Sequence, residues 1–215
     1  MRKKIISVLV IFTAFMLNAC IEFVQDIEIN DDGSGRYTFK VDLGMLQYAN
    51  PSAMSENMGF IASIREFPAK AVERLSGAQG ISELENITDE NSGIYGFRFK
   101  FVNDKALNKS LYQLADQQKM FFMPNYIKIK KKKIIITDIA PYIKKANSMR
   151  NDDPAQAMMM EQIQPYIKVT TRIHLTRVPK KTENLRSKTE QQQVIMTATM
   201  SDLVKGVNYG NKIKY

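Results

Sequence analysis

The chain has 215 residues, a formal net charge of +9, one cysteine and one histidine. A lone cysteine excludes a fold held together by internal disulfides, so we expect a domain with a substantial apolar core. A lone histidine and a lone thiol leave zinc and copper sites without their usual ligands, and we predict no metal site and no cofactor.

The first segment has the features of an export leader. Positive charges at residues 2–4 precede an apolar run from Ile5 to Leu17. As a helix this run would measure about 20 Å, which is short of the roughly 30 Å core of a bilayer. Residues 1–19 are therefore predicted to be a signal peptide rather than a permanent membrane span.

The end of the leader, Leu17-Asn18-Ala19-Cys20, resembles the lipobox of bacterial lipoproteins. The resemblance implies cleavage between Ala19 and Cys20 and transfer of a diacylglyceryl group to the Cys20 sulfur, often followed by a third acyl chain on the new amino terminus. We therefore predict that residues 20–215 form a single α+β envelope domain, tethered to a membrane through Cys20. The alternatives are an ordinary secreted protein and an uncleaved anchor.

The mature chain is predicted to open with a β-hairpin. Apolar residues alternate with polar ones on both sides of a turn that contains Gly33 and Gly35, and these residues are Ile21, Phe23, Ile27, Ile29, Tyr37, Phe39, Val41 and Leu43. We predict a register with Ile29 opposite Tyr37, which places Asp26 opposite Lys40. The turn opens like a calcium loop, but Val41 stands where a bidentate Glu is required, so no calcium site is predicted.

Strands and helices are then expected to alternate along the chain. The predicted helices are Pro68–Ser76, with Pro68 in the first turn, Asp104–Gln117, a helix from Pro154 to about Gln164, and a short helix or turn at residues 201–206. The predicted strands are residues 81–87, 94–101, a pair within 126–138, a long strand at 167–178, and a final strand at 194–200, after a polar loop at 182–192. Because hairpins carry inserted helices, we predict the α+β class with a largely antiparallel sheet.

Positive charge gathers in the carboxyl-terminal part of the chain. Residues 128–215 hold 18 basic and 7 acidic side chains, whereas residues 20–127 hold 10 and 15. In an exported protein this favours anionic lipid or acidic envelope polymers, and we predict no nucleic-acid partner. The densest run is Lys130, Lys131, Lys132 and Lys133, predicted to be a hairpin tip or a protected strand edge. A solvated surface without a partner is the alternative.

Methionine is concentrated at Met158, Met159 and Met160 in a predicted helix. Three successive residues of a helix cannot all face one core, so at least one of them is expected to be exposed or at an interface. These methionines and Lys130–Lys133 are the candidate binding surface. Filling of the core is the alternative for the methionines.

The sequence contains no pattern typical of a catalytic site. His174 lies on the polar parity of the predicted strand 167–178, with Lys168, Thr170 and Arg172. The chain has no G-x-S-x-G elbow, no phosphate-binding G-x-x-x-x-G-K-[ST] loop and no G-x-G-x-x-G motif. We therefore predict that the protein is not an enzyme.

Three stretches resemble the LppM-type domain of bacterial envelope lipoproteins: IEFVQDIEINDDGSGRYTFKVDLG, GIYGFRFKF followed by a helix, and IHLTRVPKKTENLRSKTEQQQVIMTATMSDLVKG. The resemblance implies a small α+β domain that is held at the membrane and binds lipid or lipoglycan. It supplies no catalytic residues.

We predict a non-enzymatic lipoprotein that binds a lipid or another amphiphile between its sheet and helices. The alternative is an interaction subunit that docks on an envelope protein complex. Ile21, the residue after Cys20, is not acidic, which favours the outer membrane over the inner one if the cell has both.

Overall fold

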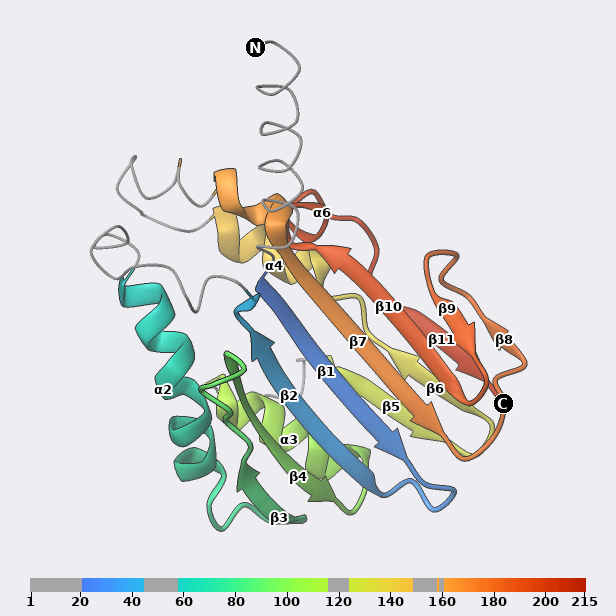
Figure 1. Cartoon of the computed structure of the whole chain (residues 1–215). Coiled ribbons are helices and arrows are strands. Elements are labelled where there is room, and N and C mark those ends of the chain that lie inside the picture. Colours follow the sequence, from blue (N-terminus) through green and yellow to red (C-terminus); the bar gives the residue numbers. More distant parts are fainter. Residues whose placement is uncertain (1–20, 45–57, 116–123, 149–157, 159–160) are drawn as a thin grey trace, which may run out of the picture.

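The computed structural model describes residues 21–44, 58–115, 124–148, 158 and 161–215. They form an α+β fold that contains a seven-stranded sheet and a four-stranded sheet (Figure 1). The predicted leader and the Cys20 tether lie outside the described residues.

The large sheet has the strand order β3-β4-β2-β1-β7-β10-β9. Its strands are β1 (Ile21–Ile29), β2 (Gly35–Asp42), β3 (Ile81–Asn86), β4 (Ile94–Phe101), β7 (Ile167–Leu175), β9 (Lys188–Glu190) and β10 (Gln193–Thr199). Neighbouring strands run antiparallel except β1 and β7, which run parallel. The predicted α+β class with a largely antiparallel sheet is confirmed.

The opening hairpin is confirmed, but the predicted register is wrong by two residues. Ile29 pairs with Gly35 and Ile27 pairs with Tyr37, so Thr38 rather than Lys40 lies opposite Asp26. A two-residue shift keeps every side chain on its face, because side chains alternate with a period of two. Lys40 therefore still reaches Asp26 diagonally, with 3.7 Å between Nζ and Oδ2.

One face of the large sheet carries the apolar core. Helix α2 (Met58–Leu75) covers the β4 side, where Phe67 contacts Phe39 and Phe97 edge-on. The four-stranded sheet, of order β5-β6-β11-β8, packs its isoleucines on the β1 and β7 side. Its strands are β5 (Ile127–Lys130), β6 (Lys133–Ile136), β8 (Lys181–Thr182) and β11 (Asn211–Lys214).

The predicted aromatic strand matches β4 at both ends. Tyr95, Phe97, Phe99 and Phe101 are all buried on the core face. Helix α3 (Asp104–Leu114) follows within its predicted range, and the side chain of Asn103 accepts a hydrogen bond from the Ala106 N–H at its start. The predicted hairpin within 126–138 is the β5–β6 pair.

The predicted start of the helix at Pro68 is wrong. Helix α2 begins at Met58, and Pro68 lies in its interior. The Pro68 ring is buried and continues the apolar stripe of Ile64, Ala71 and Leu75. Burial along this stripe offsets the hydrogen bond that a proline removes from a helix interior.

Several short elements differ from the predictions. Helix α4 (Ala140–Ser148) and strand β11 were not predicted, and the polar stretch 182–192 contains β9. Strand β7 ends at Leu175 rather than at residue 178, and β10 is not the last strand. Of the helix predicted to run from Pro154, the described residues show helical backbone at 158 and 161–163, followed by η3 (Gln164–Tyr166). The short helix α6 (Met200–Val204) is as predicted.

Two buried tyrosine hydroxyls are hydrogen-bonded inside the core. The Tyr209 hydroxyl lies 3.1 Å from Thr171 Oγ1 and also 3.1 Å from the carbonyl oxygens of Val169 and Met196. The Tyr126 hydroxyl donates to Gln25 Oε1 at 2.8 Å, and burial raises the pKa of Tyr126 to about 12. These contacts join the two sheets while satisfying groups that would be costly to bury alone.

Candidate functional site

The attachment end of the domain is fixed by strand β1. Ile21, the residue that follows Cys20, is buried and pairs with Ile167 of β7. Glu22 pairs with both Asp42 and Lys168. Strand β1 therefore begins at the residue after the predicted acylation site, so acyl chains on Cys20 would be joined to this end of the sheet without a linker. Ala19 and Cys20 themselves lie outside the described residues, and their processing stays a prediction.

Three helical elements gather at this end of the sheet (Figure 1). η3 leads directly into β7, and α6 follows directly after β10 and contacts both η3 and α4. Asp202 and Thr199 form a capping box that fixes the start of α6. We name this region, formed by η3, α4, α6 and the helical residues before η3, the attachment end.

Large apolar side chains are exposed at the attachment end. Tyr166 of η3 is 57% exposed, and Met158, in the helical stretch before η3, is 64% exposed. The prediction that at least one of the three successive methionines is exposed is confirmed by Met158. Met159 and Met160 lie outside the described residues.

Positive charge accompanies these apolar groups. Lys144, Lys145, Lys168 and Lys205 are exposed on α4, β7 and the end of α6. An ammonium group on a flexible stem can reach anionic head groups while its methylenes lie against apolar surface.

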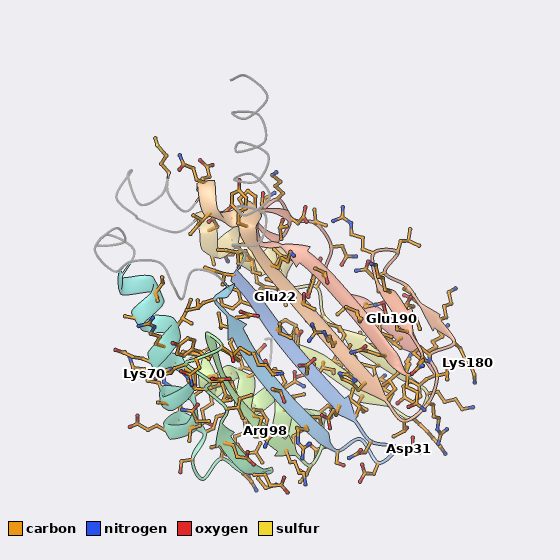
Figure 2. All side chains as sticks on the ribbon, in the orientation of Figure 1. Glu22, Asp31, Lys70, Arg98, Lys180 and Glu190 are labelled. Atoms are coloured by element: carbon orange, nitrogen blue, oxygen red, sulfur yellow. The ribbon has the colours of Figure 1, made fainter. Side chains whose placement is uncertain are left out.

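Lys130–Lys133 lie at the other end of the molecule. Lys130 pairs with Lys133, and Lys131 and Lys132 form the turn between them, so the predicted hairpin tip is confirmed. The Tyr215 N–H donates to the Lys132 carbonyl at 3.3 Å, which holds the carboxyl-terminal strand beside the tip. Figure 2 labels Glu22 and Asp31 near the two ends of β1, with Lys180 on the side of Asp31. The structure therefore does not bring the two parts of the candidate binding surface together, because the nine residues of β1 span about 26 Å between them.

The hairpin tip belongs to a larger basic surface that the sequence analysis missed. The outward-facing lysines of the four-stranded sheet are Lys128, Lys130, Lys133, Lys181, Lys212 and Lys214, which we name the lysine face. The alternation Lys212-Ile213-Lys214 was the available signal for strand β11, but the strand has only four residues. The outward face also carries Glu183, which pairs with Lys212 at 2.8 Å. The hydrogen bond from Lys212, together with the charges of Lys212, Lys214 and Lys181, lowers the pKa of Glu183.

A third surface is the polar face of the large sheet, opposite the core. It contains an open depression of about 700 Å³, lined mainly by charged side chains of β1, β2, β4 and β7. Asp26 is one of these lining residues and is 16% exposed, with Lys40 and Arg172 nitrogens at 3.7 and 3.5 Å. His174 Nε2 lies 3.7 Å from Asp26 and 3.2 Å from Gln193 Nε2, so His174 is on the polar face as predicted.

Aromatic side chains pack against one another in the apolar layer beneath helix α2. Phe97 is 1% exposed and contacts the rings of Tyr37, Phe39, Phe67 and Phe99. The depression lies on the opposite, polar face, so it does not offer the internal apolar space that the predicted amphiphile site requires. Binding of an amphiphile between sheet and helices stays a prediction.

Two further observations describe the part of the chain that the structure covers. Within it, no group of three or more His, Cys, Asp or Glu side chains is placed to hold a metal ion. No helix there has both the length and the apolar character needed to traverse a bilayer.

Comparisons with known proteins gave a distant structural likeness. Neither protein-family models nor curated protein sequences matched the chain. Among solved structures, the NMR structure of the folded domain of LppM from Mycobacterium tuberculosis matches with a TM-score of 0.42 and 12% sequence identity, over 92% of this chain and 91% of that chain. A likeness of this size is too weak to support a statement about function, so membership of the LppM family stays a prediction.

Proposed function

We propose that the protein is a non-enzymatic envelope protein, anchored by acyl chains on Cys20, whose attachment end contacts the lipid surface. The observation that carries this proposal is that no linker separates the predicted anchor, Cys20, from the first strand of the fold. Ile21 is already buried and paired with Ile167, which supports an anchoring membrane that lies against the attachment end.

The chemistry of the attachment end suits a bilayer surface. Each buried acyl methylene contributes about 0.8 kcal/mol, so two or more chains hold a protein at a membrane without a spanning helix. Tyr166 offers an apolar ring with a polar tip, the kind of side chain enriched at membrane interfaces. Lys144, Lys145, Lys168 and Lys205 would each add about 1 kcal/mol of attraction near anionic head groups.

The location follows from the leader and its cleavage site. The predicted signal peptide supports a location outside the cytoplasm, and Ile21 favours the outer membrane where a cell has two membranes. We favour this surface contact with lipid over an amphiphile bound between the sheet and the helices. It requires only side chains that are already exposed.

The proposal of a binding rather than a catalytic protein is supported by the polar face. Its carboxylate Asp26 forms ion pairs with Lys40 and Arg172, and Glu28 forms one with Arg36 at 3.7 Å. Such mutual pairing is typical of a surface ion-pair network.

The anchor is tested by the intact mass and phase partition of the protein purified from membranes. Wild type is expected to lack residues 1–19, to carry acyl chains and to enter the detergent phase. Cys20→Ala is expected to carry no acyl mass. A wild-type chain that begins at Met1 without acyl chains would contradict the proposal.

Docking on an envelope protein complex is the second candidate function. It is favoured by the open depression on the polar face, which presents paired charges that a protein partner could match. The same purification distinguishes the two candidates. A protein that co-purifies in fixed ratio favours docking, whereas phospholipid without a partner protein favours contact with lipid alone.

A further inference from the structure

The lysine face contains a straight row of four lysines. Lys130 pairs with Lys133, Lys133 pairs with Lys214, and Lys214 pairs with Lys181, one residue from each of the four strands. Neighbouring strands lie about 4.8 Å apart, so the row extends over about 14 Å. We name it the lysine row.

Like charges on directly opposed strand positions repel each other. Among the described residues, none of the four lysines of the row forms an ion pair with a carboxylate, because Glu183 pairs with Lys212 outside the row. The fold therefore brings together four cations, none of which has an ion-pair partner among the described residues, although the carboxylate of Glu183 acts on Lys214 and Lys181 at longer range. An anion with several charges would remove this repulsion.

We propose that the lysine row binds a linear polyanion, a polymer with phosphate or carboxylate groups along its length. Ammonium groups act as point charges and do not require one fixed geometry of the anion. The four charges lie along a line rather than around a cavity, and the depression of the protein is on another face. A row of this kind matches repeated charges on a strand better than it matches one small ion.

The position of the row distinguishes a polymer from the anchoring membrane. Ile129, the neighbour of Lys130, lies beside the β1–β2 turn, with its Cγ2 3.8 Å from the Cβ position of Gly33. The row is therefore near the end of β1 that is about 26 Å from Ile21. The Debye length at physiological ionic strength is about 8 Å, so the head groups of the anchoring bilayer would be screened there. This step alone rests on the proposed function.

The proposal is tested with Lys133→Gln/Lys214→Gln, which removes the two central charges of the row. The matched control is Lys105→Gln/Lys109→Gln, which removes two exposed charges from helix α3, outside both proposed binding surfaces. Binding of fluorescently labelled long-chain inorganic polyphosphate to the detergent-solubilised protein is measured by anisotropy. For comparison, orthophosphate is tested at the same total concentration of phosphate.

Wild type is expected to bind polyphosphate, and salt should weaken this binding. Its affinity for orthophosphate should be much lower. The row variant should bind polyphosphate about 30-fold more weakly, whereas the control should retain wild-type affinity. Thermal unfolding checks folding, and the row variant should be at least as stable as wild type because repulsion is relieved.

Three results would overturn the proposal: no binding by wild type, equal loss in both variants, or equal affinity for orthophosphate. Equal loss would mean that binding follows net charge rather than the row. Because the assay is performed in detergent solution, unacylated Cys20→Ala should bind polyphosphate as wild type does. A failure of the membrane anchor and a failure of the lysine row are therefore separable.

Discussion

Asn108 is the residue that joins helix α3 to the edge of the four-stranded sheet. Its side chain is fully buried, and its Nδ2 donates to the Ile127 carbonyl at 2.7 Å. Its Oδ1 accepts from the Ile127 N–H at 3.1 Å. Asp104 accepts from the Ile129 N–H in the same way. Two side chains of one helix thus form hydrogen bonds with the edge of β5. They cover backbone groups that could otherwise pair with a strand of another molecule.

We expect Asn108→Ala to lower the free energy of unfolding by about 2 to 4 kcal/mol, because it leaves a buried N–H and a buried carbonyl of Ile127 without partners. Lys109→Ala, at the exposed neighbouring position of α3, should change it by less than about 0.5 kcal/mol. Denaturant unfolding of both variants gives the comparison. Equal stability of the two variants would show that Asn108 does not hold the edge.

The turn of the first hairpin shows why the register was predicted two residues out. The sequence suggests that Gly35 is a turn residue, but it is the first residue of β2. A Cβ on Gly35 would lie 2.6 Å from the Phe101 ring, so the glycine is required by packing rather than by the turn. The turn is shortened instead by Asp32, whose carboxylate accepts from the N–H and hydroxyl of Ser34. Neither contact is visible in an alternation of apolar residues.

At the scale of elements, the strength of the local pattern decided which predictions were confirmed. Strand β4 has four aromatic residues on one parity, and both of its ends were predicted correctly. Helix α4 lacks a wide apolar stripe, although Asp138 caps the N–H of Ala140 and Pro141 stands in its first turn. The start of α2 was missed because proline marks helix starts far more often than buried helix interiors.

Substitution of two glycines tests the contact between the start of β3 and helix α3. Gly77 and Gly80 both have positive φ, of 72° and 84°. A Cβ on Gly77 meets nothing within 4 Å, whereas a Cβ on Gly80 would lie 2.8 Å from the Cβ of Ala106 in α3.

We expect Gly77→Ala to cost about 1 kcal/mol of stability, from backbone strain alone. Gly80→Ala should cost about 1 to 3 kcal/mol more, because α3 must also move away from the strand. The difference between their thermal unfolding midpoints measures the packing contribution. Equal midpoints would contradict the close approach of α3.

At the scale of the whole molecule, the sequence predicted the parts of the candidate surface but not their arrangement. Met158 and Lys130–Lys133 were both singled out, and the structure places them at opposite ends of the domain. The lysine row could not be predicted, because it combines β5 and β6 with the short strands β8 and β11 from distant parts of the chain. Pairing between such strands depends on the tertiary fold rather than on local pattern.

Under the two proposals, the domain would have two functional ends. The attachment end has exposed Tyr166 and Met158 with nearby lysines, which suits lipid. The far end has the lysine row, which suits a polyanion away from the membrane. A protein of this design would connect a bilayer with a charged polymer about 26 Å above it, a distance set by the nine residues of β1.

The most direct test of this orientation uses the single cysteine of the chain. Once its sulfur is acylated, a cysteine introduced elsewhere is the only free thiol, so Tyr166→Cys and Val178→Cys can each be labelled with one fluorophore. Val178 is 61% exposed and follows the end of β7 that pairs with Ile29, so it is the matched position at the far end.

The measurement is quenching of each label, in vesicles that carry the acylated protein, by a quencher attached to lipid and by iodide in water. The label at residue 166 is expected to be quenched by the lipid quencher and protected from iodide. The label at residue 178 is expected to show the reverse. Equal quenching of both labels by iodide, with none by the lipid quencher, would contradict a domain that stands on the membrane by its attachment end.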